Sequence, residues 1–141
     1  NQRLLDLAAT KGIPVVDLFH LLKDHRDGFS LAGIDIAPTG GLPGDHLFLS
    51  DGFHPGTVAQ GLLANTVLEA IRLGFGEIHP LISDQEILTR AGLTPLGNET
   101  TYRNTSQYVI TVPEASGAVL ILAAGATALL YRRCRGQQPA H

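Results

Sequence analysis

Apolar positions near the start of the chain change from helical to strand-like spacing. Those of segment 1–12 lie on one side of a helix: Leu4, Leu5, Leu7 and Ala8. Gly12 suits the C-terminal end of this helix. Segment 13–18 then predicts a buried strand, with Pro14 at its start, where a missing N–H is tolerated. A helix followed by a short apolar strand is the second half of a βαβ unit, which favours a parallel sheet.

The next part of the chain predicts a cap, a short helix and a long loop. Asp17 ends the strand, and the pattern favours a helix-capping role for it over a catalytic one. In the helix expected over residues 18–25, His20 and His25 are interpreted as surface residues. Segment 26–45 is polar, rich in Gly and Pro and without a clear period. We therefore expect a long loop there, which could shape a substrate cleft.

An amphipathic helix is expected over residues 57–72. The positions of its apolar face recur at i and i+4: Val58, Ala59, Leu62, Leu63, Thr66, Val67, Ala70 and Ile71. Residues 57–60 fit a capping box at its start, and Gly74 and Gly76 end it. We expect this helix to pack on the sheet and to support the loop that precedes it.

Segment 76–111 predicts a short helical appendix and a polar linker. Residues 83–86, Ser-Asp-Gln-Glu, form a second capping-box pattern, which opens a helix that continues through Arg90. Segment 95–111 is rich in Gly, Asn, Thr and Ser. It is interpreted as a linker with an extended piece at 107–112.

The last part of the chain, 112–141, changes character. Residues 117–131 carry no charged side chain, and arginines follow directly at positions 132, 133 and 135. An uncharged run of roughly 15 residues is at the short edge for crossing a bilayer, which needs about 20. The arginines favour one transmembrane helix with a cytoplasmic C-terminus over the alternative, a buried C-terminal helix.

Composition limits the possible classes of protein. The 141 residues suffice for about one domain, and the 44% that are hydrophobic can form a core. The net charge is −3 and the basic residues are scattered except near the C-terminus, which gives no support to nucleic-acid binding. The single cysteine, Cys134, excludes an internal disulfide and a Cys-cluster zinc site. Because the chain has no methionine and begins with Asn1, we interpret it as a fragment whose N-terminal part is missing.

The candidate chemistry lies in segment 47–56, Leu-Phe-Leu-Ser-Asp-Gly-Phe-His-Pro-Gly. A short apolar run places Asp51 and His54, three residues apart, on a loop in front of a helix. Gly52 gives the backbone the freedom for both side chains to turn to one side, and Pro55 stiffens the exit. A carboxylate that fixes the tautomer of an imidazole makes that imidazole a proton-transfer base. The alternative is that Asp51 only caps a turn and His54 is incidental.

This Asp-x-x-His-Pro block before an amphipathic helix resembles the last conserved block of the SGNH (GDSL-like) esterases and lipases. The resemblance covers residues 1–75 and implies an α/β fold, the C-terminal part of a three-layer, flavodoxin-like hydrolase domain. It implies that His54 is the general base and Asp51 its orienter, and it implies no cofactor. The serine block and oxyanion-hole residues of the family do not occur here in the correct order. We therefore expect the nucleophile upstream, and we expect the fragment alone to be inactive.

The tail resembles the PEP-CTERM sorting signal of Gram-negative bacteria. Val112, Pro113 and Glu114 match its motif, and an apolar run and arginines follow in the same order. Ala115 stands where the family usually has a second proline. The resemblance implies export to the cell envelope, at least transient membrane anchoring, and processing by an exosortase-type enzyme. The complete protein is then expected to be an envelope hydrolase acting on a small-molecule, carbohydrate or lipid ester.

Two alternatives come from other classes of protein. Asp45, His46, Asp51 and His54 cluster within ten residues, and carboxylate with imidazole could bind a divalent metal, although the spacing matches no standard site. The other alternative is a non-catalytic, anchored envelope protein or carbohydrate-binding module with a degenerate hydrolase fold. An upstream serine block distinguishes an esterase from such a protein.

Overall fold

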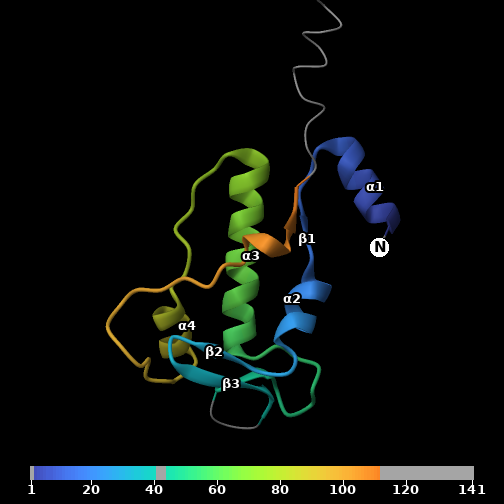
Figure 1. The fold of residues 1–141 in the computed structure, drawn as a ribbon. Helices are drawn as coiled ribbons and strands as arrows, with labels where there is room; N and C mark the ends of the chain where they lie inside the picture. The colour runs from blue at the N-terminus through green and yellow to red at the C-terminus, as the bar shows by residue number, and fades with distance from the viewer. Residues whose placement is uncertain (1, 41–43, 112–141) are drawn as a thin grey trace, which may run out of the picture. The chain divides into compact units, whose positions relative to one another are not determined.

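The computed structural model describes residues 2–40 and 44–111, whose helices and strands form a mixed α/β unit with small sheets (Figure 1). The chain divides into two units, Asn1–Thr111 and Val112–His141, and the first is described here. No helix within the described ranges is long and apolar enough to cross a membrane. The predicted transmembrane helix and sorting motif lie outside these ranges.

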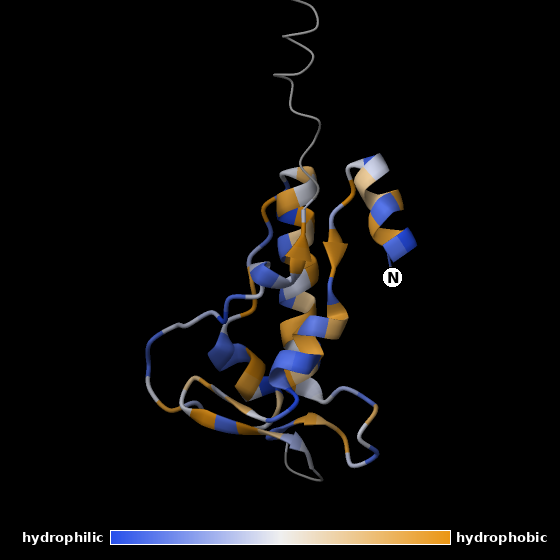
Figure 2. Ribbon diagram, turned by 45° about the vertical axis from the view of Figure 1, so that its right-hand side comes forward, coloured by the Kyte–Doolittle hydropathy of each residue, from blue (hydrophilic) through white to orange (hydrophobic). Residues whose placement is uncertain are grey.

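The N-terminal helix forms where the sequence predicts it, but the strand is limited to two half-buried residues of the predicted buried segment 13–18 and pairs in an unexpected direction. α1 spans Gln2–Lys11, and Gly12 follows it with a positive φ of 63°. β1 (Val15–Val16) pairs antiparallel with β5 (Val109–Ile110), the orange segment beside β1 in Figure 1. Both strands are hydrophobic throughout (Figure 2). The parallel pairing expected for β1 is wrong within the described residues, because a distant segment returns to occupy one edge of this strand.

A three-stranded sheet replaces the long loop predicted over residues 26–45. Its strands are, in chain order, β2 (Phe29–Leu31), β3 (Ile34–Thr39) and β4 (His46–Phe48). β2 and β3 form an antiparallel hairpin, and β4 lies parallel to β3. Ala32 and Gly33 connect the hairpin with positive φ values of 41° and 82°, as a tight two-residue turn requires. Inward and outward side chains alternate along the hairpin, which buries Leu31 and Ile36. The alternation continues over too few residues to be recognised in a segment rich in Gly and Pro.

α3 (Thr57–Phe75) contacts most of the other elements, and it extends the predicted helix by one turn. Its buried residues are Val58, Ala59, Leu62, Asn65, Thr66 and Ala70. The predicted capping box is wrong: Gly56 is the N-cap and offers no side chain, while the Gln60 amide donates to the Pro55 carbonyl at 3.0 Å. Gly76 ends the helix with a φ of 70°, as predicted.

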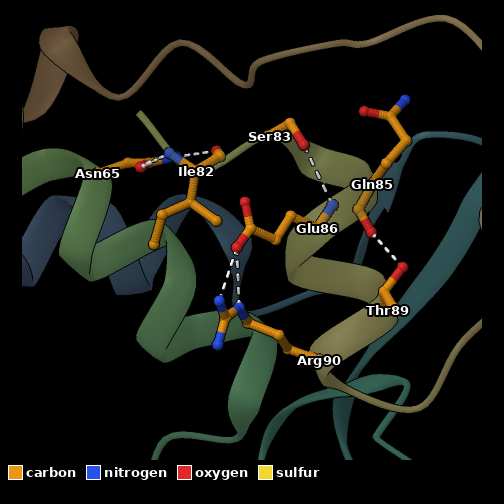
Figure 3. Close-up of polar contacts among 7 residues, drawn as sticks. All are labelled: Asn65, Ile82, Ser83, Gln85, Glu86, Thr89 and Arg90. Carbon is orange, nitrogen blue, oxygen red and sulfur yellow. Dashed lines mark hydrogen bonds and ion pairs between the residues drawn. The ribbon is translucent and has the colours of Figure 1, made fainter. Parts of the chain in front are cut away.

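The main hydrophobic core lies between the hairpin, α3 and α4 (Asp84–Arg90). Its buried members are Leu31, Ile36, Val58, Leu62, Ile87 and Leu88. One half of the predicted capping box of α4 forms, because the Ser83 hydroxyl accepts from the Glu86 N–H at 3.2 Å, whereas the Glu86 carboxylate accepts from Arg90 instead of the Ser83 N–H. Beside this cap, the buried Asn65 side chain bonds both backbone groups of Ile82 and so joins α3 to the segment that leads into α4 (Figure 3).

The end of the segment predicted as a linker packs on the helices. It contains the short 3-10 helix η1 (Ser106–Tyr108) as well as β5. Tyr108 is buried, and its hydroxyl donates to Asp24 at 3.2 Å. Its carbonyl accepts from the Asp17 N–H at 2.8 Å. The end of this segment is therefore part of the packed unit and not a free linker.

His25, at the end of α2 (Leu18–His25), is buried, and its predicted surface position is wrong. Its Nδ1 lies 2.7 Å from the Leu21 carbonyl, and its Nε2 accepts from the Arg103 guanidinium at 2.7 Å. A carbonyl only accepts, so Nδ1 carries the proton and the ring is neutral. Burial lowers the pKa of His25 below its ordinary value, and the nearby Arg103 charge acts in the same direction. The histidine faces inward because these partners lie there, and Arg103 is far away in the sequence.

We expect the free energy of unfolding to fall as the pH drops below about 6.5, the ordinary pKa of histidine. The folded pKa of His25 is the lower one, so the unfolded state binds the proton first and the stabilisation is complete only above that pH. The loss approaches about 1.4 kcal/mol per pH unit until the folded pKa is reached. Urea unfolding between about pH 7.5 and pH 5.5 measures it. His25→Gln should make this pH-dependent fall in the free energy of unfolding smaller, and the exposed control His20→Gln should leave it unchanged. An equally large fall in H25Q contradicts the prediction.

Candidate active site

The loop between β4 and α3 carries the candidate residues, and its backbone is closed by its own hydrogen bonds. The Leu49 N–H donates to the His54 carbonyl at 2.8 Å, and the Gly52 N–H donates to the Leu49 carbonyl at 2.8 Å. The Gly56 N–H donates to the Leu47 carbonyl at 2.8 Å, just before α3 begins. Gly52 has a φ of 68°, a left-handed conformation that glycine adopts without steric cost. The loop therefore turns back on itself between the end of a strand and the start of a helix.

Asp51 and His54, the predicted catalytic pair, are in direct contact. Asp51 Oδ2 lies 2.6 Å from His54 Nδ1. The other carboxylate oxygen, Oδ1, accepts from the N–H groups of Phe53 at 2.9 Å and His54 at 3.0 Å. The hydrogen bond from the His54 ring is the largest cause that lowers the pKa of Asp51, and the two backbone N–H groups add to it. Asp51 is thus an ionised acceptor throughout the physiological pH range.

This contact fixes the chemistry of the imidazole. A carboxylate can only accept, so His54 Nδ1 carries the proton and a neutral His54 has Nε2 as its acceptor. The side chains of His54 and Asp51 are 66% and 48% exposed, so the pair lies at the surface of the described unit. Such an imidazole can take a proton at Nε2 and return it while the carboxylate holds its orientation.

A second pair, Asp17 and His20, has the same local geometry. Asp17 Oδ2 lies 2.6 Å from His20 Nδ1, and Oδ1 accepts from the His20 N–H at 3.1 Å. The hydrogen bond from this N–H is the main cause that lowers the pKa of Asp17. Asp17 is the N-cap of α2, so its predicted capping role is confirmed. The sequence interpretation missed the pair, although Asp-x-Phe-His at 17–20 recurs at 51–54 and could have revealed it.

The four residues of the metal alternative do not come together. Within residues 2–40 and 44–111, no three His, Cys, Asp or Glu side chains are placed to share a metal ion. His46 is buried in β4, with its Nδ1 3.9 Å from Asp45, whereas Asp51 and His54 face one another at the surface. The described residues therefore give no support to a metal centre.

A hollow lies beside the second pair. It measures about 420 Å³ and is mostly apolar; α1, β1 and β5 line it through Leu4, Val15 and Ile110, and Asp17 and His20 also border it. Phe19 borders both this hollow and a smaller one of about 320 Å³ that includes Phe48, at the end of β4. Neither of these two hollows is lined by Asp51 or His54.

No family model, curated protein or solved structure matches this chain. The functional assignment therefore depends on the sequence patterns and on the geometry of Asp51 and His54.

Proposed function

We propose that this chain is the C-terminal part of a serine ester hydrolase of the SGNH type, with His54 as general base and Asp51 as its orienter. The observation that supports this most is the 2.6 Å contact of an ionised Asp51 with His54 Nδ1, on a loop that follows a strand and precedes a long helix. Residues 1–75 would then be the last part of a three-layer, flavodoxin-like domain. The mixed helix and strand content is compatible with that fold.

In the proposed mechanism, a serine outside residues 1–141 attacks the ester carbonyl. His54 Nε2 accepts the hydroxyl proton as the new carbon–oxygen bond forms, and Asp51 stabilises the resulting imidazolium. The imidazolium then donates this proton to the alcohol oxygen, which leaves as the ester bond breaks. Water, activated by the same imidazole, releases the acid from the serine in a second cycle. The proposal requires no cofactor.

The proposed site of action is the cell envelope. The support is the order of Val112-Pro113-Glu114, an uncharged run over 117–131 and terminal arginines, which resembles a sorting signal. An exosortase-type enzyme would process the tail after export, and the apolar run would anchor the protein in the membrane at least transiently. The proposed substrate is a small-molecule, carbohydrate or lipid ester.

One observation favours a second candidate, a non-catalytic anchored envelope protein. Asp17 and His20 form the same 2.6 Å contact, although Asp17 has a sufficient structural role as the cap of α2. An Asp–His pair of this geometry can therefore form for structural reasons alone. The two candidates differ in whether a reactive serine accompanies His54.

A fluorophosphonate probe, which modifies activated serines, separates these candidates. In the full-length protein we expect one labelled serine upstream of residue 1, with ester hydrolysis lost as labelling proceeds. The isolated 141-residue chain should hydrolyse no ester and take up no probe. Hydrolysis without any labelled serine would contradict the mechanism, and His54-dependent turnover by the isolated chain would contradict the predicted position of the nucleophile.

A further inference from the structure

Phe53 is the most exposed aromatic side chain of the candidate loop and lies against the candidate base. Phe53 is 78% exposed, so its ring contributes little to the core. Its ring meets the His54 ring edge to face, with centroids 5.4 Å apart and planes at 87°. Its N–H is bonded to Asp51, as described above. The same carboxylate that orients the imidazole therefore also fixes the backbone from which the Phe53 ring projects.

Phe19 is the corresponding ring beside the second histidine, and it is 62% exposed. It also meets its histidine edge to face, with centroids of the Phe19 and His20 rings 5.2 Å apart at 85°. The Lys23 ammonium, however, lies over the face of Phe19, 5.9 Å from the ring centroid. Among the described residues, no cation lies in this way over Phe53. The loop also carries Leu49, which is 43% exposed and whose N–H donates to the His54 carbonyl.

We propose that Phe53 contacts the alcohol portion of the ester and selects substrates whose alcohol is apolar. This inference rests on the proposed function, because it uses the position of the general base. The imidazole must give its proton to the leaving alcohol oxygen, so the alcohol portion lies next to the His54 ring. Phe53 touches that ring. An apolar alcohol would therefore be removed from water by the loop, whereas a sugar hydroxyl cluster would lose its hydration there.

The backbone that carries the ring is fixed by the loop, because the Phe53 N–H donates to Asp51. A ligand that covers the ring therefore has to order the side chain but not the loop backbone, which limits the entropy cost of the contact. Discrimination by one apolar contact of this size is on the order of tenfold in kcat/KM.

The test uses acetate esters that share the acyl group and differ in the alcohol: ethyl, hexyl and benzyl acetate, with a glucose 6-acetate for comparison. In the full-length protein, Phe53→Ala should lower the ratio of kcat/KM for benzyl over ethyl acetate by about tenfold. Phe53→Leu should restore much of the preference for hexyl acetate. The matched control Phe19→Ala should change neither ratio by more than about twofold, and circular dichroism should show that all variants fold.

An unchanged benzyl-to-ethyl ratio in Phe53→Ala, with hydrolysis that still depends on His54, overturns the assignment of Phe53 and leaves the proposed function intact. A larger loss for the glucose ester than for benzyl acetate would also overturn it, because the ring would then stack on a sugar. If the full-length protein shows no His54-dependent hydrolysis, the proposed function and this assignment fail together.

Discussion

His54→Ala is expected to lower kcat for ester hydrolysis by the full-length protein by about a thousandfold or more. The substitution removes the group that takes the serine proton and returns it to the alcohol. Because the His54 side chain is 66% exposed and lies in a surface loop, its loss should change the free energy of unfolding by less than about 1 kcal/mol. Initial rates with an unactivated ester, together with urea unfolding of the same preparation, measure both quantities.

His20→Ala is the matched control for this experiment. His20 has the same contact to an aspartate three residues earlier and the same edge-to-face phenylalanine, so general effects of breaking such a pair appear in both variants. We expect its kcat to stay within about twofold of the unsubstituted protein. Equal losses in the two variants would assign the effect to local structure, and unchanged turnover in H54A would rule out His54 as the base.

Asp51→Asn addresses the role of the carboxylate. An amide carries no charge and cannot stabilise the imidazolium. Its N–H can also donate to Nδ1 of His54, which places the ring proton on Nε2, so that Nε2 can no longer accept the serine proton. Turnover should then fall strongly while Gly52 still allows the loop to turn.

The local patterns in the sequence predicted most of the helices and the contact at the site. Asp51 and His54 are three residues apart with Gly52 between them, so one turn is enough to bring them together. The start of α4 and the end of α3 also depend on adjacent residues, Ser83 and Gly76, and both were predicted correctly.

The errors arose where structure depends on distant partners. His25 is buried because Arg103 reaches it from the other end of the unit, and no local pattern carries that information. β1 pairs with residues about ninety positions away, which reverses the direction expected from a βαβ unit. The hairpin of β2 and β3 depends on only two buried residues, Leu31 and Ile36, and is hidden in a segment of polar composition.

Asn65→Ala is expected to lower the free energy of unfolding by about 3 kcal/mol, the largest effect on stability that we predict. Asn65 lies on α3 and is completely buried. Its amide nitrogen donates to the Ile82 carbonyl at 2.7 Å, and its amide oxygen accepts from the Ile82 N–H at 2.8 Å (Figure 3). Alanine leaves both backbone groups without a partner, and each unpaired buried group costs about 1–3 kcal/mol.

Two further variants separate the causes of this loss. Asn65→Leu keeps the number and branching of the side-chain heavy atoms, with bulkier methyl groups, but makes neither hydrogen bond, so it should be nearly as unstable as N65A if the backbone groups of Ile82 determine the effect. Gln60→Ala removes one exposed hydrogen bond from the same helix and should cost less than about 1 kcal/mol. Urea unfolding of the three variants and the unsubstituted chain gives the comparison. If N65L were as stable as the unsubstituted chain, the two bonds to Ile82 would contribute nothing, and the loss in N65A would come from the cavity alone.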